Sequence, residues 1–146
     1  MATTRRWTRN LGVALCSIVA IGCGATPPAE DVPTCAEYCD QVMSSCTEGT
    51  AQYPDRDSCE ASCLAFAAGE LDDASGNTIG CRIFHAGAAA VDAETHCAHA
   101  GPGGASTCGS NCDGFCAVAR EVCTGDNEVY ANDKGCRADC ATFPDT

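Results

Sequence analysis

The sequence predicts a small, disulfide-rich, all-α fold in which two pseudo-repeated, disulfide-stapled helical hairpins are joined by a helical insert. The first observation behind this prediction is a cysteine pattern, C-x3-C-x6-C-x12-C-x3-C, that starts at Cys35 and starts again, with the same spacing, at Cys112. The second is composition, because 15 of the 146 residues are cysteine while only 5% are aromatic. A core with so few large side chains depends on disulfides for its stability, and disulfides persist in oxidising compartments.

The chain begins with the features of an export signal. Arg5, Arg6 and Arg9 form a basic start, and a short apolar run follows from Leu11 to Ile21. A membrane-spanning helix needs about 20 apolar residues, so this run is too short to act as a transmembrane anchor. We therefore expect residues 1–22 to be a signal peptide.

Gly22 and Cys23 close the signal with a small residue directly before a cysteine. This arrangement resembles the lipobox of bacterial lipoproteins. The resemblance implies cleavage before Cys23, a diacylglycerol on its sulfur and a further acyl chain such as palmitate, which together anchor a protein stably. With Gly24 in the next position, the resemblance to Gram-negative lipoproteins also implies sorting to the outer membrane, where the protein would face the periplasm or the exterior. Ordinary cleavage near Ala25, which would give a soluble secreted protein, is the alternative.

The segment after the lipid site and the net charge of the mature chain indicate which partners the protein contacts. Residues 23–33 contain three prolines and predict a short, stiff tether. The formal net charge of −12 becomes −15 when the signal, with three arginines and no acids, is removed. Such a surface repels nucleic-acid phosphates. We therefore expect contact with the membrane through the lipid anchor, and with a protein partner, but not with nucleic acid.

Each repeat predicts a pair of antiparallel helices. Residues four apart lie on the same face of a helix, so the C-x3-C pairs of the first repeat place helices at about 34–46 and 56–68, the second capped by Asp55 or Asp57. The second repeat predicts the same hairpin. The expected organisation after the tether is one Cys-rich domain, residues 34–146, with repeat 1 at 34–68, the insert at 76–108 and repeat 2 at 111–143.

Antiparallel pairing of the C-x3-C cysteines gives two equally spaced disulfides in each hairpin, about 6 Å apart because a helix rises 1.5 Å per residue. The expected bonds are Cys35–Cys63 and Cys39–Cys59 in repeat 1, and Cys112–Cys140 and Cys116–Cys136 in repeat 2. A second ladder, Cys39–Cys63 with Cys46–Cys59, sets a seven-residue gap against a four-residue gap and fits less well. It stays open, because sequence alone does not determine connectivity.

The insert between the repeats is not duplicated, and it holds all three histidines of the chain. Cys81 and His85 lie four residues apart on a helix expected over about 79–91, so both face one side of that helix. A short turn capped by Asp92 or Thr95 follows, and it carries the other two histidines. The insert is therefore the segment in which a chemical site is expected.

Histidine and cysteine are the usual protein ligands of zinc and copper. His85, His96 and His99 can therefore form a metal site, with Cys97 as a further thiolate ligand. The competing interpretation is that Cys97 forms a disulfide in an oxidised protein and that the histidines are structural. Covalent haem is not expected, because the sequence contains no C-x-x-C-H motif.

Cysteine parity leaves one thiol without a partner in the same chain. Apart from the signal and the lipid site, the chain has 13 cysteines, which can form at most six disulfides. We expect Cys46 and Cys123 to bond to each other or to Cys81 and Cys108 of the insert. We expect Cys97 to be the unpaired cysteine, because the neighbouring imidazoles can stabilise its thiolate.

Two resemblances support this fold. The twin C-x3-C hairpins resemble those of small intermembrane-space chaperones in spacing, although Cys46 and Cys123 depart from that pattern. The chain also resembles Cys-rich lipoproteins of myxobacteria through the segments Gly80 to His85 and His96 to Pro102. The second resemblance implies export and a disulfide-stapled helical fold, and it implies no particular activity.

The leading expectation for function is a membrane-anchored, extracytoplasmic structural or interaction lipoprotein without enzymatic activity. The sequence contains no C-x-x-C redox motif, nucleophile elbow, Walker loop or H-E-x-x-H motif. The alternative is binding or delivery of zinc or copper through His85, His96 and His99. No other cofactor is expected.

Overall fold

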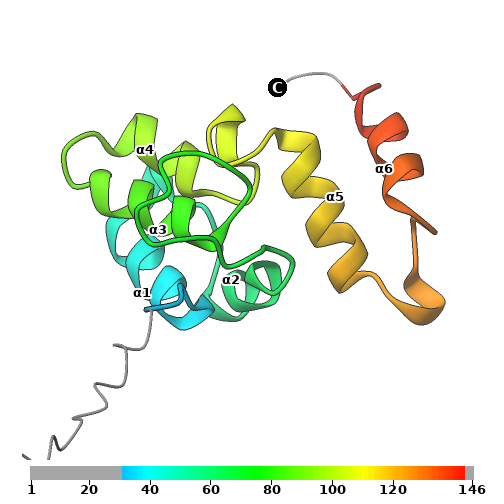
Figure 1. The fold of residues 1–146 in the computed structure, drawn as a ribbon, viewed down its shortest axis with the longest axis horizontal. Coiled ribbons are helices and arrows are strands. Elements are labelled where there is room, and N and C mark those ends of the chain that lie inside the picture. The colour runs from blue at the N-terminus through cyan, green and yellow to red at the C-terminus, as the bar shows by residue number, and fades with distance from the viewer. Residues whose placement is uncertain (1–30, 144–146) are drawn as a thin grey trace, which may run out of the picture.

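The computed structural model describes residues 31–143, and the α-helix is the main element of this part of the chain (Figure 1). This confirms the expected all-α class. The α-helices between residues 31 and 143 are α1 (Cys35–Ser45), α2 (Arg56–Cys63), α3 (Ile79–Ala88), α4 (Ala93–Ala100), α5 (Asn111–Val122) and α6 (Asp133–Cys140). Short 3-10 turns lie at η1 (Glu48–Thr50), η2 (Gly104–Ser106) and η3 (Gly125–Asn127).

The expected signal peptide, the lipid site at Cys23 and most of the tether lie outside the described residues. Within residues 31–143, no helix has both the length and the apolar composition needed to cross a membrane.

Side-chain caps set the starts of the helices of the first hairpin. At the start of α1, the hydroxyl of Thr34 accepts a hydrogen bond from the backbone N–H of Glu37, and the Glu37 carboxylate accepts one from the backbone N–H of Thr34. At the start of α2, the carboxylate of Asp55 accepts a hydrogen bond from the backbone N–H of Ser58 at 2.8 Å. Asp55 is one of the two caps that the sequence predicts.

Two disulfides staple each hairpin. The bonds are Cys35–Cys63 and Cys39–Cys59 between α1 and α2, and Cys112–Cys140 and Cys116–Cys136 between α5 and α6. The Cα–Cα distances of 5.6 to 5.9 Å are ordinary for disulfides. These are the antiparallel pairs that the equal spacing predicts, and the alternative ladder through Cys46 is not formed.

The second helix of the first hairpin is shorter than expected. α2 ends at Cys63 rather than near residue 68, because the chain turns back toward the start of α3. The backbone N–H of Ile79 donates to the carbonyl of Ala67 at 2.8 Å, and the next pair of residues forms an equivalent bond at 2.9 Å. These bonds satisfy backbone N–H groups in the first turn of α3, which have no acceptor within the helix.

The helices of the insert, α3 and α4, pack against α1 and bury its apolar face (Figure 1). Tyr38 and Val42 of α1 are 0% and 1% exposed. The hydroxyl of Tyr38 donates to the backbone carbonyl of Ala100 at the end of α4, at 2.7 Å. Burial raises the pKa of Tyr38 well above its ordinary value, so the phenol keeps the proton that makes this bond.

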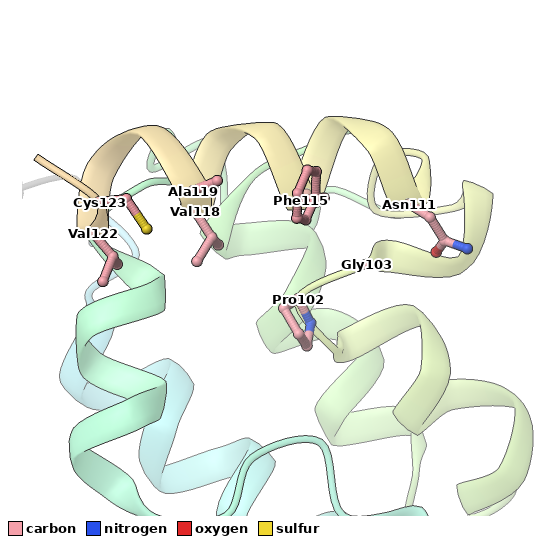
Figure 2. A pocket seen from close by; sticks show the side chains of 9 residues that line it. Pro102, Gly103, Asn111, Phe115, Val118, Ala119, Val122 and Cys123 are labelled. Atoms are coloured by element: carbon pink, nitrogen blue, oxygen red, sulfur yellow. The ribbon is translucent and has the colours of Figure 1, made fainter. Parts of the chain in front are cut away.

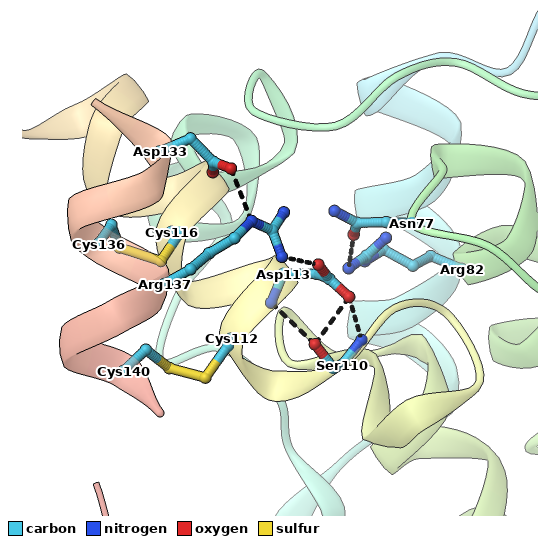
Figure 3. A network of polar contacts seen from close by, with 10 residues as sticks. All are labelled: Asn77, Arg82, Ser110, Cys112, Asp113, Cys116, Asp133, Cys136, Arg137 and Cys140. Carbon is cyan, nitrogen blue, oxygen red and sulfur yellow. Dashed lines mark hydrogen bonds and ion pairs between the residues drawn. A yellow bond between two sulfur atoms is a disulfide. The ribbon is translucent and has the colours of Figure 1, made fainter. Parts of the chain in front are cut away.

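Arg82 of α3 is fully buried and joins the two ends of the insert. Its guanidinium lies 3.6 Å from the centroid of the Phe66 ring. It donates to the side chain of Asn77 at 2.8 Å (Figure 3) and to backbone carbonyls before α3 and after α4, including that of Pro102 at 3.2 Å. Burial lowers its pKa, and these acceptors compensate for lost hydration. The arginine therefore holds the segment after α4 against the start of α3.

The second hairpin, α5 and α6, packs on α2 and on the segment around η2, away from α3 (Figure 1). Its buried core consists only of cysteines from its own two disulfides. α5 approaches the segment after α4 so closely that a Cβ on Gly114 would lie 1.9 Å from the carbonyl oxygen of Pro102. Much of the apolar face of α5 stays uncovered, and Phe115 is 40% exposed.

Candidate metal centre

The structure brings together the three histidines that the sequence singled out. His85 lies in the last turn of α3, and His96 and His99 lie on α4. One ring nitrogen of each histidine lies within 4.8 Å of a nitrogen of each of the other two. Nδ1 of His85 and Nδ1 of His96 are 3.0 Å apart. Three nitrogen donors from two helices therefore converge.

The three rings also pack on one another. The His85 and His96 rings are stacked, with centroids 5.3 Å apart and an interplanar angle of 26°. The His99 ring stands edge-on to that of His85, with centroids 4.8 Å apart. His85 is 6% exposed, whereas the two histidines of α4 are half-buried. The cluster is closed on the α3 side and accessible from the α4 side.

Two disulfides fix the helices that carry the histidines. Cys81, one turn before His85 on α3, bonds to Cys108. Cys97, which lies between the two histidines of α4, bonds to Cys46 at the end of α1. Because each helix is covalently attached beside its histidines, the positions of the three rings are preorganised.

The tautomer of His85 follows from its hydrogen bond to the backbone. Its Nε2 lies 3.1 Å from the carbonyl oxygen of Ala74. A carbonyl can only accept a hydrogen bond, so Nε2 carries the proton and, in the neutral ring, Nδ1 carries a lone pair. This lone pair is on the side of the ring that faces His96. Metal-binding histidines commonly donate their other ring N–H to a carbonyl in this way.

One ring nitrogen of His99 has no hydrogen-bond partner. Its Nδ1 is buried, and no protein group among residues 31–143 bonds to it. Burial, together with the nearby His85 and His96, lowers the pKa of His99 below its usual 6.5. His99 is therefore neutral at pH 7, and the neutral imidazole is the form that binds metals. A metal ion would compensate for the desolvation of this ring.

The geometry is close to that of a three-histidine site. Zinc–nitrogen bonds of about 2.0–2.1 Å in a tetrahedron place two ligand nitrogens about 3.3 Å apart. The pair at 3.0 Å is within about 0.3 Å of this spacing, and the other separations, all within 4.8 Å, need to shorten by at most about 1.5 Å. Three imidazoles suit zinc and copper(II), and they do not suit the oxygen-seeking ions magnesium and calcium.

The prediction for Cys97 is wrong. Its sulfur is bonded to Cys46, so it cannot serve as a thiolate ligand, and the unpaired cysteine among residues 31–143 is Cys123. Expected bonds of Cys123 to other cysteines are likewise absent from the described residues. The reason is the packing of α4, which directs Cys97 toward α1. Cys81 and Cys108 are disulfide-bonded, but to each other rather than to Cys46 or Cys123 as expected.

A second feature, which sequence reasoning missed, is an apolar groove along α5 (Figure 2). It has a volume of about 460 Å³ and lies between α5 and Pro102. Phe115, Val118 and Val122 line its α5 side, and the free thiol of Cys123 lies at its end. The groove therefore combines apolar surface with the one unpaired cysteine of residues 31–143.

The duplication contains the signal that could have identified this groove. When the two cysteine patterns are aligned, Phe115 and Cys123 of the second repeat correspond to Tyr38 and Cys46 of the first. The residues of the first repeat are 0% and 4% exposed because the insert covers them. The chain has one insert and two hairpins, so one of the two equivalent faces is left open.

Comparison with the curated proteins finds no match for this chain, and comparison with the solved structures finds none either. Residues 32–113 match the model of the BfoA family C-terminal domain. The matched segment contains the first hairpin and all three histidines, and it ends near the start of α5. Because the match covers more than half of its 146 residues, the chain belongs to the BfoA family through this C-terminal domain.

Proposed function

We propose that this protein is a membrane-anchored, extracytoplasmic, non-enzymatic module that binds zinc or copper(II) through His85, His96 and His99. The observation that carries the proposal is the convergence of the three ring nitrogens within 4.8 Å of one another. The hydrogen bond of His85 to a carbonyl and the unpartnered nitrogen of His99 support it further. Either metal accepts an additional ligand from water or from a partner on the accessible side.

The extracytoplasmic part of the proposal is supported by the cysteines. Six disulfides connect the described residues, and such a number is typical of proteins that fold in oxidising compartments. The lipobox-like Gly22 and Cys23 support anchoring in the outer membrane, as in the lipoproteins that the chain resembles. Cys23→Ala should prevent incorporation of labelled fatty acid and release the protein from the membrane fraction. Unchanged fractionation of this variant would contradict the anchor.

Metal binding is tested on the fully oxidised protein by titration calorimetry with zinc and with copper(II). We expect one ion per chain, and a loss of affinity of about 100-fold or more in His96→Ala and His99→Ala, since each removes one of three ligands. Glu94→Ala is the matched control, because Glu94 is exposed on the same helix and is not part of the cluster. Equal affinities of all the variants would refute the histidine site.

The groove along α5 supports a second candidate function, the docking of a protein partner. In the first hairpin the equivalent face is covered by helices, one of which supplies Cys97 to bond Cys46. A partner of matching chemistry would present an apolar helix with a cysteine that reaches Cys123. In cells, a disulfide-linked adduct should then be lost in Cys123→Ser and in Val118→Asp. It should persist in Val129→Asp, which changes an exposed residue outside the groove.

A further inference from the structure

We infer that Cys81 and Cys108 bind a metal ion when the disulfide between them is reduced, so that metal binding and disulfide formation compete for these two cysteines. His85 is then a ligand in both this thiolate site and the histidine site. The inference deepens the proposed function and rests on it, because the histidine site is one of its two halves. It concerns which metal ligands the protein uses when the Cys81–Cys108 bond is oxidised and which it uses when this bond is reduced.

The geometry places a second possible donor set directly beside the first. The two sulfurs and one ring nitrogen of His85 lie within 4.8 Å of one another. Cys81 and His85 are one turn apart on the same face of α3, and Cys108 reaches them from the segment after η2. All three residues are buried. His85 thus belongs to both donor sets.

The disulfide and a bound metal exclude each other. Two sulfurs in a disulfide are about 2.0 Å apart, whereas two thiolates on tetrahedral zinc are about 3.8 Å apart because each zinc–sulfur bond is about 2.3 Å. In the oxidised protein only the histidine set can therefore hold a metal. In the reduced protein Cys81, Cys108 and His85 form a Cys2His set, to which a histidine of α4 or water adds the fourth ligand.

The exchange between the two states balances with a dithiol as reductant. The dithiol transfers two electrons and two protons to the Cys81–Cys108 bond and becomes a disulfide, which leaves two thiols on the protein. Zinc then binds the two sulfurs and displaces the two protons. In the opposite direction, a disulfide-containing oxidant accepts two electrons from the thiolates, takes up two protons and leaves as a dithiol, and the new Cys81–Cys108 bond removes both sulfurs from the metal. His85 remains a ligand in either state, so the metal passes to the histidine set without leaving the site.

The two donor sets favour different ions. Thiolates favour zinc and copper(I), whereas imidazoles alone suit zinc and copper(II). A newly exported chain, whose cysteines are still reduced, would take up zinc through the thiolate set. Disulfide formation would then convert the site to one that accepts copper(II) as readily as zinc. The oxidation state of a single bond therefore sets the metal preference.

The test is oxidative refolding of the fully reduced chain with and without zinc, followed by mapping of free thiols by mass spectrometry. Without zinc, we expect Cys123 as the one free thiol among residues 31–143. With zinc, we expect Cys81 and Cys108 to stay free as well, and the hairpin disulfides to form normally. Addition of a chelator should then allow the sixth bond to form.

Two variants separate this inference from the proposed function. His85→Ala should abolish the protection of the two cysteines by zinc, whereas the double variant His96→Ala/His99→Ala should retain it and lose metal binding only in the oxidised state. Formation of all six bonds at the same rate with and without zinc would overturn the inference and leave the histidine site intact. Equal protection of the hairpin cysteines would overturn it too, since binding would then be unspecific.

Discussion

Cys46 and Cys123 occupy the same position in the two repeats but differ in their bonding. Cys46 follows α1, is 4% exposed and bonds to Cys97 of α4. Cys123 follows α5, is half-buried and has no partner among the residues that the structure describes. The difference arises from the insert, which covers the first hairpin and supplies a cysteine only there.

Labelling of free thiols tests this assignment. Under denaturing, non-reducing conditions, a maleimide should modify Cys123 and no other cysteine of residues 31–143, because the other twelve form six disulfides. Peptide mapping by mass spectrometry identifies the labelled residue, and Cys123→Ser should remove the label from this part of the chain. A label on Cys97 would contradict its bond to Cys46.

The two hairpins also carry the same ion-pair arrangement with the charges exchanged. Arg56 of α2 pairs with Glu60 one turn later. Arg137 of α6 pairs with Asp133 one turn earlier and with Asp113 across the hairpin on α5 (Figure 3). Alignment of the two repeats superposes positions 56 and 60 on 133 and 137, so each hairpin keeps its pair with opposite polarity. These pairs are exposed and contribute modestly to stability.

The pair with Asp113 predicts a pH dependence of stability. Hydrogen bonds from Arg137, and then from Ser110, lower the pKa of the Asp113 carboxyl from 3.8 to about 2. Because the folded protein holds this proton less tightly than the unfolded chain, the ionised carboxylate stabilises the fold above pH 3.8, and this contribution is lost as the pH falls toward 2. Asp113→Asn should therefore lower the free energy of unfolding at pH 7 and have almost no effect near pH 2.

Urea unfolding at the two pH values measures this difference. Asp126→Asn is the control, because Asp126 is exposed and makes no ion pair in the described part of the chain. An equal loss of stability in Asp113→Asn at pH 7 and pH 2 would show that the carboxylate charge is not what matters at this position.

At the scale of elements, local signals predicted the hairpins well and the insert less well. Caps and C-x3-C spacing lie within a few residues of each other, so α1 and the start of α2 follow directly from the sequence. α3 was expected to continue to residue 91 but ends at Ala88. The short turn expected after Asp92 is instead an eight-residue helix capped by that residue. The chain needs the residues after α3 to turn back, so that α4 can pack beside it.

The histidine cluster could be predicted in part because its three residues are close together in the sequence. All three histidines belong to one segment of the chain, and spacing on two neighbouring helices limits how far apart they can lie. The partner of Cys97 could not be predicted, because it depends on how the insert docks on α1. The groove along α5 is open because the insert docks on the first hairpin and leaves the second hairpin uncovered. Both are consequences of tertiary packing, which leaves no local pattern.

Close packing at the start of α3 predicts opposite effects for two glycines of one helix. A Cβ on Gly80 would lie 1.8 Å from the carbonyl oxygen of Glu70, whereas a Cβ on Gly87 would meet nothing within 4 Å. Gly80→Ala should therefore destabilise the protein by about 1–3 kcal/mol, since the backbone must move. Gly87→Ala should stabilise it by about 0.5–1 kcal/mol through helix propensity and a smaller loss of backbone entropy.

Chemical denaturation of the two variants, at the same pH and in the absence of reductant, gives both values. The comparison is internal, because both changes add one methyl group to the same helix. A Gly80→Ala variant as stable as the parent would show that the chain segment around Glu70 can shift without cost, and would remove the packing argument for the start of α3.

At the scale of the whole molecule, the six disulfides form two separate covalent units. The loops Cys35–Cys63, Cys46–Cys97 and Cys81–Cys108 overlap and together enclose every residue from 35 to 108. The loop Cys112–Cys140 encloses every residue from 112 to 140. No disulfide among the described residues joins the two units, and residues 109–111 lie outside every loop. The contacts between the second hairpin and the rest of residues 31–143 are therefore non-covalent.

Limited proteolysis tests this division. A protease recognition sequence inserted after Gly109 should allow cleavage to separate the oxidised protein into two fragments under denaturing conditions without reductant. The same sequence inserted after Asp72 should give fragments that stay linked through Cys46–Cys97 and separate only after reduction. Non-reducing electrophoresis distinguishes the two results, and fragments that remain linked after cleavage at Gly109 would reveal a disulfide between the units.

This covalent division determines how the molecule would respond to tension. When a force pulls residues 31 and 143 apart, disulfides resist extension within both units, whereas no disulfide spans residues 109–111. Three residues reach about 10 Å when fully extended, so stretching would first separate the second hairpin from α2 over this short span. The cross-linked unit that carries the histidines would keep its shape meanwhile. A mechanical load would thus be absorbed away from the proposed metal site.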